Sequence, residues 1–302
     1  MTPLVSIVTP SYNQGAYLEA TIESVLAQDY PAIEYLVVDD GSTDGSVELA
    51  QRYAGRLTFV RQRNAGQVAA LNNGFARSRG EILGWINSDD TLLPRAVSAV
   101  VSELVADPDA LLVYGDNLFI DELGAELFTL HAREFDAAAM VRACDNHVPQ
   151  PGSLFRRRAL ELAPLNEAGY YFFDLEFALQ LSAHGKVKRV DRVLGGYRVH
   201  PEAKTIGAPV KKAQDYVRIA DEFFATPLLP ETLRPHAAAG RRTAYTRAAE
   251  YFYEGLDLGR ARRYALRARS FPLLLRTLLP ARLVRALRAR RRPASPARSV
   301  PS

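Results

Sequence analysis

The sequence predicts an α/β protein built on an open, mostly parallel sheet. In the first ninety residues, short apolar runs of the strand type alternate with segments whose apolar residues recur at helical spacing, which is typical of a parallel sheet with helical crossovers. A length of 302 residues, with 48% hydrophobic and 24% charged residues, is ordinary for a globular chain with a sizeable core. We therefore expect a mixed but mostly parallel sheet flanked by helices.

Each of the first four strands is an apolar or β-branched run that stops at polar or turn-forming residues. We expect these strands at residues 5–10, 34–38, 57–61 and 81–86. The helices between them are indicated by apolar residues on one helical face: Leu18, Ile22, Val25 and Leu26, then Val47, Ala50 and Tyr53, then Val68, Leu71 and Phe75. Pro31 follows the first of these helices and Gly80 the third, and residues of these types stop a helix.

The pattern is less regular beyond residue 90. A helix over 93–105 and a strand over 110–114 are expected, followed by a segment rich in loop signals from 121 to 170. Further elements are expected as a helix at 173–184, a strand at 187–190, a loop at 201–209, and helices from 211 that include a pair at 236–253 and 257–270. We infer a main domain at 1–205, a helical extension at 206–271 and a basic tail at 272–302 that is disordered beyond Arg292.

The composition argues against a secreted or membrane-spanning protein. Cys144 is the single cysteine, so no internal disulfide can form, which is usual in a reducing compartment. The first strand begins within a few residues of Met1, without a charged or apolar leader, so we expect no signal peptide. No run of about 18 uncharged apolar residues occurs, so no transmembrane helix is expected. We therefore expect a cytoplasmic protein.

Charge is divided unevenly along the chain. The net charge is +4, but residues 259–302 hold 13 arginines and no acidic residue, so the remainder is acidic. Among these arginines, four leucines recur at every fourth position: Leu275, Leu279, Leu283 and Leu287. This pattern, although Pro280 interrupts it, favours a helix lying on an anionic membrane, with the protein peripheral on the inner face. The alternative is that the leucines pack on the main domain and the arginines are solvated.

Adjacent carboxylates follow two of the predicted strands. Asp39 and Asp40 come after the second strand, and Asp89 and Asp90 after the fourth. Ligands of an open parallel sheet bind beyond the carboxyl ends of its strands, so both pairs are delivered to one rim. Hard oxygen ligands there suit Mg²⁺ or Mn²⁺ held against a diphosphate, although Asp-rich turns and helix caps look the same in sequence. No Gly-x-Gly-x-x-Gly or P-loop motif occurs, which argues against those nucleotide sites.

Five motifs resemble, in order, those of the family-2 glycosyltransferases with the GT-A fold, an inverting group that includes bacterial polysaccharide enzymes. They are Val5-Ser6-Ile7-Val8-Thr9-Pro10-Ser11-Tyr12-Asn13, Val38-Asp39-Asp40-Gly41-Ser42-Thr43-Asp44-Gly45-Ser46, Asn64-Ala65-Gly66-Gln67, Asn87-Ser88-Asp89-Asp90 and Tyr197-Arg198-Val199-His200. Each motif is weak alone, but the ordered set spans about 200 residues. The resemblance implies a GT-A fold, which is a Rossmann-like mixed and mostly parallel sheet flanked by helices, here with a helical C-terminal extension.

The same resemblance implies roles for individual residues. The nucleotide-sugar site would contain Thr9, Pro10, Tyr12, Asp39, Asp40, Asn64, Gly66, Gln67, Asp89 and Arg198. Pro10, Tyr12 and Asp39 resemble the pocket for the nucleotide base, which Asp40 would share. Asp90 resembles the metal ligand of a D-x-D-type motif, written here as Ser-Asp-Asp. His200 resembles the late histidine that closes over the metal or the diphosphate, although a lone histidine is often structural.

The catalytic base is expected in the segment Phe172-Phe173-Asp174-Leu175-Glu176-Phe177. Inverting transfer needs a carboxylate to take the proton of the acceptor hydroxyl and a cation for the leaving diphosphate. The family places its base at an acidic position in this segment, often written Glu-Asp, and Phe173 replaces the first acid here. We expect Asp174 to be the base, with Glu176 as the alternative. Either acid would also favour the N-terminus of the predicted helix electrostatically.

The function expected from the sequence is metal-assisted, inverting transfer of a sugar to a hydroxyl acceptor. The expected partners are a nucleoside diphosphate sugar, a saccharide or lipid-linked acceptor such as a growing surface glycan, Mg²⁺ or Mn²⁺, and an anionic membrane surface, with no nucleic acid. A sugar-phosphate nucleotidyltransferase is the first alternative, but it would want a basic loop at residues 9–17, which hold no basic residue. A non-catalytic nucleotide-sugar-binding protein is the second, and the intact acids Asp39, Asp90 and Asp174 argue against it.

Overall fold

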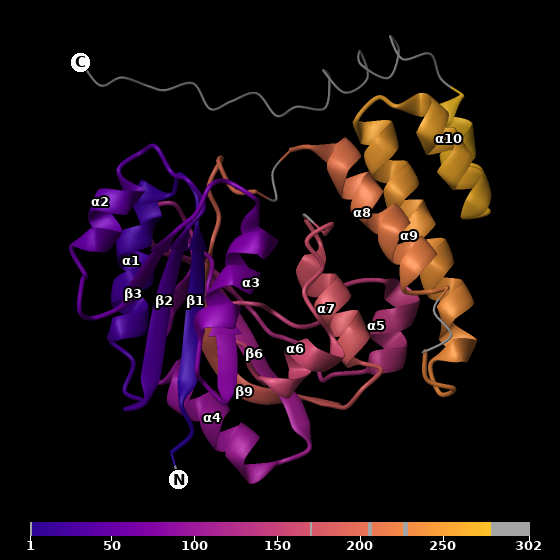
Figure 1. Ribbon diagram of the computed structural model, residues 1–302. Coiled ribbons are helices and arrows are strands. Elements are labelled where there is room, and N and C mark those ends of the chain that lie inside the picture. Colours follow the sequence, from indigo (N-terminus) through magenta and orange to yellow (C-terminus); the bar gives the residue numbers. More distant parts are fainter. Residues whose placement is uncertain (1, 170, 205–206, 226–228, 279–302) are drawn as a thin grey trace.

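The computed structural model describes residues 2–169, 171–204, 207–225 and 229–278, and Figure 1 shows the arrangement of its elements. The strands are β1 (Val5–Ser11), β2 (Ile33–Asp39), β3 (Thr58–Arg61), β4 (Ile82–Trp85), β5 (Thr91–Leu92), β6 (Ala110–Ile120), β7 (Glu126–Leu130), β8 (Leu154–Arg156) and β9 (Lys186–Arg198). The helices are α1 (Gly15–Leu26), α2 (Ser46–Gln51), α3 (Gln67–Arg77), α4 (Ala96–Ala106), α5 (Ala137–Ala143), α6 (Arg158–Leu162), α7 (Phe173–Leu181), α8 (Pro209–Glu222), α9 (Arg234–Glu254), α10 (Leu258–Arg267) and α11 (Phe271–Thr277).

The described strands form one sheet in the order β3-β2-β1-β4-β8-β6-β9-β5, with β7 paired to β6 outside this path. β1 runs parallel to β2 and β4, and β2 runs parallel to β3. β8 is antiparallel to both β4 and β6, whereas β6 and β9 are parallel. The predicted parallel arrangement of the first four strands is confirmed, and their C-terminal ends meet at one edge, where Ser11 is in register with Asp39.

Side chains of the central strands alternate between two apolar layers, as the pleat of a strand requires. Ile7 and Val37 belong to the layer in which α1 and α4 pack. Val8 and Val38 belong to the other layer, which contains α3, α5, α7, α8 and α9. Gly74 of α3 lies so close to β1 that an added Cβ would meet a methyl group of Val8 at 2.5 Å. This close packing fixes α3, which begins just beyond the C-terminal edge of the sheet.

The second apolar layer continues into the C-terminal helices. Phe173 of α7, Tyr216 of α8, Phe252 of α9 and Leu273 of α11 belong to the same buried cluster as Val8. Figure 1 shows α8, α9 and α10 beyond α5 and α7, on the side away from β1, β2 and β3. The helical extension is present, and it packs on the α/β part through this shared core. None of the described helices is both long enough and apolar enough to cross a membrane.

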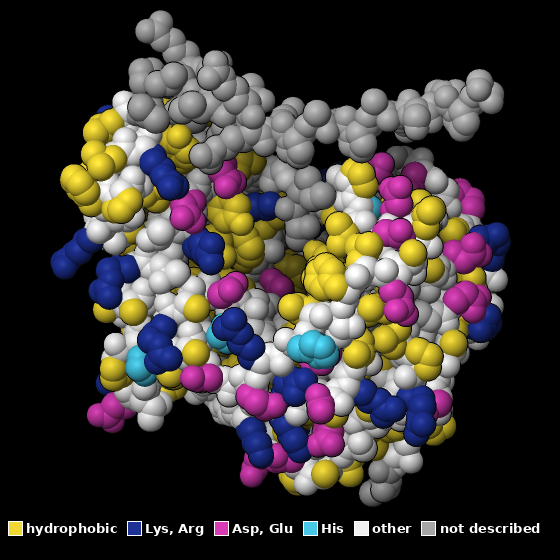
Figure 2. All heavy atoms as spheres, turned by 180° about the vertical axis from the view of Figure 1, so that it is seen from behind, with side chains coloured by type: hydrophobic (Ala, Val, Ile, Leu, Met, Phe, Trp, Pro, Cys, Tyr) yellow, Lys and Arg dark blue, Asp and Glu magenta, His cyan; other side chains and the backbone are white. Residues whose placement is uncertain are grey.

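The last described helices expose an apolar patch. Its members and their exposed fractions are Leu266 (60%), Phe271 (67%), Leu275 (49%) and Leu278 (57%). Figure 2 shows apolar side chains gathered at the upper left, where α10 and the end of the described chain lie. The other leucines of the predicted stripe, Leu279, Leu283 and Leu287, and the segment expected to be disordered, lie outside the described residues.

Several elements differ from the prediction. β6 continues to Ile120 and β9 extends over Lys186–Arg198, because these two strands pair with each other along most of their length. The helix expected from residue 93 begins at Ala96, since the backbone N–H of Leu93 instead donates to the Leu194 carbonyl of β9 at 2.9 Å. The segment 121–170, in which only loop signals had been identified, contains β7, α5, β8 and α6. β5, β8 and β9 depend on partners distant in sequence, which a local pattern does not report.

Candidate active site

A pocket of about 790 Å³ lies at the C-terminal edge of the parallel strands. Its volume is in the range of small-molecule sites. Most of the predicted site residues line it: Pro10, Tyr12, Asp40, Asn64, Gly66, Gln67, Asp89, Asp90, Asp174 and Arg198. Segments that are far apart in the sequence, from the end of β1 to the loop after β9, therefore line one pocket. This agrees with the expectation that the carboxyl ends of the parallel strands meet at one rim.

The end of β1 places an aromatic ring at the pocket. Tyr12 is 49% exposed, so its ring is available for stacking on a planar ligand, and Pro10 lines the pocket beside it. Thr9 points away: it is fully buried, and its hydroxyl lies 3.0 Å from that of Tyr35 on β2. The structure therefore gives Thr9 a role inside the sheet rather than in the pocket lining.

Asp39 and Asp40 have different partners at the end of β2. Asp39 is 1% exposed, and its carboxylate accepts a hydrogen bond from the backbone N–H of Ser42 at 3.2 Å. Asp40 lines the pocket, and its two oxygens accept from the backbone N–H groups of Ala65 and Gly66, each at 2.8 Å. The structure thus brings Asp40 rather than Asp39 to the pocket, while Asp39 holds the turn after the strand.

Asp90 is buried at the floor of the site. Its Oδ1 accepts from the backbone N–H of Arg198 at 2.9 Å, and its Oδ2 accepts from Asn87 Nδ2 at 3.0 Å. Its carbonyl accepts from the Thr21 hydroxyl at 2.7 Å, which ties the acid to α1. Burial, and secondarily the charge of Asp89, raise the pKa of Asp90 well above its usual value. Two carboxylates arranged in this way are stabilised by a positive charge between or beside them.

His200 lies behind Asp89, outside the pocket lining. Its Nε2 is 3.2 Å from Asp89 Oδ2, and its ring packs on that of Tyr17 with 4.5 Å between the ring centroids. Its buried Nδ1 has no hydrogen-bond partner among the described residues. Arg198 donates from Nε to the Asp89 carbonyl at 2.8 Å and from a terminal nitrogen to the Asp121 carbonyl at 3.1 Å. Both side chains therefore fix the position of the acidic turn.

These residues fit a divalent cation that arrives with a phosphate ligand. In the described part of the chain, no three His, Cys, Asp or Glu side chains gather into a complete metal cage. Mg²⁺ is usually held by one or two carboxylates, with substrate phosphates and water completing its coordination, and Asp89 and Asp90 satisfy that requirement. His200 would then orient Asp89 from behind, since its Nε2 contacts that carboxylate and the residue does not line the pocket.

Asp174 lines the pocket at the first turn of α7. Its Oδ2 accepts from Asn146 Nδ2 at 3.0 Å. Burial raises the pKa of Asp174, against hydrogen bonds from the Leu175 backbone and from Asn146 and against the nearby charge of Lys204. A carboxylate of this kind is a stronger proton acceptor than an exposed aspartate.

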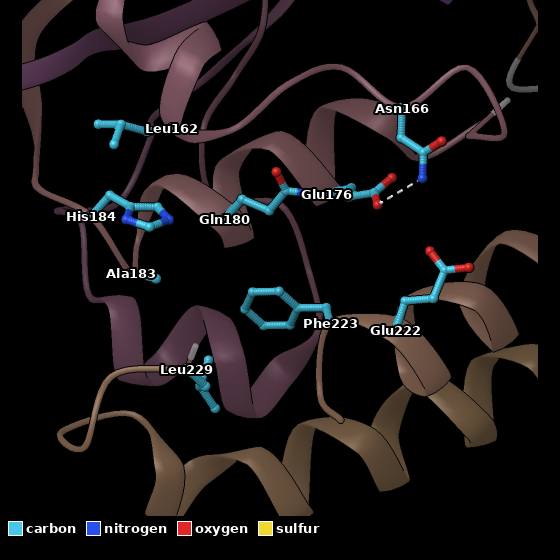
Figure 3. Close-up of a pocket in the computed structure, with 9 residues that line it drawn as sticks. All are labelled: Leu162, Asn166, Glu176, Gln180, Ala183, His184, Glu222, Phe223 and Leu229. Atoms are coloured by element: carbon cyan, nitrogen blue, oxygen red, sulfur yellow. Dashed lines mark hydrogen bonds between the residues drawn. The ribbon is translucent and has the colours of Figure 1, made fainter. Parts of the chain in front are cut away.

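Glu176 lies two positions further along α7, and Figure 3 shows its carboxylate directed toward Asn166. It lines a separate cavity of about 280 Å³ together with Asn166 and Gln180. Its Oε1 is 2.7 Å from a terminal nitrogen of Arg218, and the two side chains are 7% and 12% exposed. Glu176 is therefore half of a buried ion pair, and the structure does not bring it to the pocket that holds Asp174.

The pocket also contains residues that the sequence reasoning did not assign. They are Ser11, Asn13, Gln14, Trp85, Asn87, Ser88, Gln150, Tyr171, Phe173, Tyr197, Glu202, Ala203 and Lys204. Five of them belong to motifs that had already been singled out, so their place in a motif was a usable signal: Ser11, Asn13, Asn87, Ser88 and Tyr197. Lys204 had no such signal, because it is a single basic residue in a stretch expected to be a loop.

Comparison with known proteins agrees with this arrangement. A sequence profile described as glycosyl transferase family 2 matches residues 6–161, which is about half of the chain. The chain belongs to glycosyl transferase family 2. It is 34% identical over 236 residues to an uncharacterized glycosyltransferase of Rickettsia typhi, a match that covers 74% of this chain and 72% of that protein. The predicted family is confirmed, and the protein is a glycosyltransferase.

A second relative of this family-2 glycosyltransferase is much longer. Chondroitin synthase of Escherichia coli is 30% identical over 232 residues, which are 74% of this chain and 33% of that enzyme. The chain thus spans about a third of the chondroitin synthase that it matches.

Solved structures confirm the GT-A fold. The crystal structure of S. aureus TarS 1-349 has a TM-score of 0.64 and 18% identity, over 94% of this chain and 87% of that chain. The complex of TarS 1-349 with UDP-GlcNAc has a TM-score of 0.62 and 14% identity, over 95% and 92%. The mannosyltransferase PcManGT of Pyrobaculum calidifontis, in complex with GDP-Man and Mn²⁺, has a TM-score of 0.55 and 19% identity, over 92% and 86%.

Proposed function

We propose that this glycosyltransferase moves a sugar from a nucleoside diphosphate sugar to a hydroxyl of a saccharide or lipid-linked acceptor, with inversion at the anomeric carbon and assisted by Mg²⁺ or Mn²⁺. The observation that carries the proposal is that Asp174 lines the same pocket as Asp89 and Asp90. Inverting transfer needs a base for the acceptor and a cation for the leaving group around one reacting carbon. The pocket offers carboxylates for both tasks.

In the proposed reaction, the Asp174 carboxylate takes the proton of the acceptor hydroxyl. The hydroxyl oxygen bonds to the anomeric carbon while the bond from that carbon to the diphosphate oxygen breaks. The raised pKa of Asp174 favours proton transfer once the carboxylate is ionised. A divalent cation, when bound, would supply positive charge to the leaving diphosphate, and Asp89 and Asp90 would hold it.

The residues that line the pocket at the ends of β1 and β2 suit the nucleoside. The exposed ring of Tyr12 and the side chain of Pro10 offer a stacking surface, and Asp40 with Asn64 offers polar groups to a base or ribose. Relatives with this fold support the donor class, since TarS is in complex with UDP-GlcNAc and PcManGT with GDP-Man. In this proposal Asp39 acts indirectly, by holding the turn that positions Asp40.

We also propose that the enzyme works at the inner face of an anionic membrane. The exposed apolar patch of α10 and α11 lies within the arginine-rich segment, and Arg262, Arg263 and Arg276 are exposed there too. Apolar side chains bordered by arginines suit the boundary between acyl chains and anionic headgroups. Such a location would bring the pocket to a lipid-linked acceptor or a growing surface glycan.

The proposal is tested by donor turnover with UDP- and GDP-sugars, with and without Mg²⁺ or Mn²⁺. One of these donors should be consumed in a metal-dependent way, and a chelator or Asp90→Asn should each remove most of the activity. Full turnover in chelator would contradict the metal assignment. The anomeric configuration of the product, read by NMR, tests inversion, and a retained configuration would contradict a single displacement with Asp174 as base. Failure to bind any nucleoside diphosphate sugar would contradict the whole proposal.

A further inference from the structure

The pocket proposed to bind the sugar donor contains more acidic than basic side chains. Among the described residues that line it are five carboxylates, those of Asp40, Asp89, Asp90, Asp174 and Glu202, and two basic side chains, those of Arg198 and Lys204. A nucleoside diphosphate brings further negative charge into this space. One divalent cation beside Asp89 and Asp90 leaves the remaining acids uncompensated, so the two basic side chains matter for donor binding.

Arg198 is already engaged in holding the fold. Its guanidinium donates to the backbone carbonyls of Asp89, Asp121 and Glu122, at distances of 2.8, 3.1 and 3.3 Å. It also lies over the ring of Tyr17, with 5.2 Å between its central carbon and the ring centroid. Moving it toward a phosphate would leave three carbonyls to find other donors. Arg198 therefore suits the role of a positioning residue for the acidic turn.

Lys204 differs, because its charge lies at the pocket wall. Its Nζ donates to Gln67 Oε1 at 2.7 Å and lies 5.6 and 5.7 Å from the ring centroids of Tyr171 and Phe173. Burial lowers the pKa of Lys204 to about 8, while the nearby charges of Asp174, Asp215 and Asp89 act in the opposite direction. The ammonium is thus largely charged near pH 7. Because it is mostly shielded from water, its electrostatic attraction to a negatively charged ligand is stronger than it would be in bulk solvent.

A hydrogen-bond chain connects this ammonium to the acid proposed to hold the metal. Gln67, which accepts from Lys204, donates from Nε2 to Asn87 Oδ1 at 2.8 Å. Asn87 in turn donates from Nδ2 to Asp90 Oδ2 at 3.0 Å. Two amide side chains thus fix the distance between a cation and the buried carboxylate across one side of the pocket. A ligand that carries two linked phosphates is suited to interact with both ends of such an arrangement.

We propose that the Lys204 ammonium binds the diphosphate of the donor and stabilises it as it leaves. This inference rests on the proposed function, since it names a further residue of the same site. Lysine is a common phosphate ligand that acts as a compact point charge on a flexible stem. Contact with the diphosphate would favour both ground-state binding and the departure of the leaving group, because negative charge builds up on that group as the glycosidic bond breaks.

The test compares nucleoside diphosphates with nucleosides in titration calorimetry at saturating Mg²⁺. The probes are UDP against uridine and GDP against guanosine, and the pair that the wild-type chain binds is carried through the variants. Lys204→Met should weaken diphosphate binding by about tenfold or more, while nucleoside binding changes by less than about twofold. Lys204→Arg should restore most of the loss. Lys212→Met is the matched control, because Lys212 also lies over Tyr171, at 5.6 Å, but outside the described pocket lining.

Equal weakening of diphosphate and nucleoside by Lys204→Met would overturn the inference and leave Lys204 a structural role. So would an unchanged diphosphate affinity, or the same loss in Lys212→Met. If Lys204→Met does not fold, Lys204→Gln is measured in the same way. A wild-type chain that binds neither UDP nor GDP contradicts the proposed function itself, and this inference with it, so the two failures are seen at different steps.

Discussion

Asp174 and Glu176 lie two residues apart on α7, yet we expect their amide substitutions to have opposite effects. Asp174→Asn removes the proposed base from the pocket and should lower turnover by roughly 10² to 10⁴, with donor affinity nearly unchanged. Glu176→Gln should leave the turnover of the folded enzyme close to that of the wild type and should lower its stability. One pair of variants thus separates a chemical role from a structural one.

The stability effect of Glu176→Gln follows from its buried ion pair with Arg218. Both side chains are nearly excluded from solvent, at 7% and 12% exposed. Removing one partner of such a pair costs about 3 to 5 kcal/mol, because the other charge stays buried without compensation. Glu222 lies 3.5 Å from the same arginine and compensates in part, so we expect about 3 kcal/mol. At about 2 to 4 °C for each kcal/mol, the midpoint of thermal unfolding should fall by roughly 6 to 12 °C.

Asp174→Asn should act on stability in the other direction. Burial raises the pKa of Asp174, so the native state favours the neutral form more than the unfolded chain does. At neutral pH the ionised carboxylate therefore disfavours folding, and a neutral amide of the same shape relieves that cost. The unfolding midpoint of Asp174→Asn should be equal to that of the wild type or higher.

Circular dichroism melts and steady-state turnover below every midpoint decide between these outcomes. Glu222→Gln is the control, since Glu222 is 59% exposed and an exposed partner contributes about 0 to 1 kcal/mol. Loss of turnover in Glu176→Gln, with retention in Asp174→Asn, would move the base to Glu176. An unchanged midpoint in Glu176→Gln would refute the ion-pair reasoning.

Three further predictions follow from the site and the tail. In titration calorimetry, Asp40→Ala should weaken nucleoside diphosphate binding more than Asp39→Ala, because Asp40 lines the pocket and holds the loop before α3; an unchanged dissociation constant in Asp39→Ala would leave that acid as a turn cap. The raised pKa of Asp174 predicts that kcat/KM falls as pH decreases, with a midpoint above the ordinary aspartate value of about 4, since only the ionised form accepts a proton; a profile flat down to that pH would contradict this. Liposome flotation should recover the whole chain with anionic but not neutral vesicles, and should recover a chain ending at Leu278 less well; equal recovery of the two chains would remove the tail from membrane binding.

The N-terminal part of the fold could be predicted because its signals are local. β1 is buried along its whole length, and β4 likewise, so each appears in the sequence as a continuous apolar run. β9 could be predicted only in part, because exposed charged residues such as Lys186 and Asp191 interrupt its apolar pattern. It is a strand along its length because β6 lies beside it, and that pairing joins segments about 75 residues apart.

The site residues were predictable from the sequence only where their role does not depend on contacts with distant segments. Successive helical residues are rotated by about 100°, so two acids two positions apart on α7 point to nearly opposite sides, and the sequence alone implies that only one reaches a given pocket. Which one it is depends on where Arg218 lies, on a helix that packs against α7 from far along the chain. Lys204 is a similar case, since nothing in its neighbours along the sequence predicts its contact with Gln67.

The charges of the pocket explain why the metal and the donor belong to one binding event in this proposal. Asp90 is buried beside Asp89, and its raised pKa means that the pair resists carrying two negative charges without a cation. Arg198 donates a hydrogen bond to Asp90 through its backbone N–H, while its guanidinium donates to backbone carbonyls. A diphosphate alone would add repulsion, whereas a diphosphate with a divalent cation supplies positive charge to the acids and negative charge to Lys204. Linkage then requires that donor and metal raise each other's affinity by the same factor. Asp89 and Asp90 would thus supply some of the ligands of the metal, and the diphosphate of the donor would supply the others.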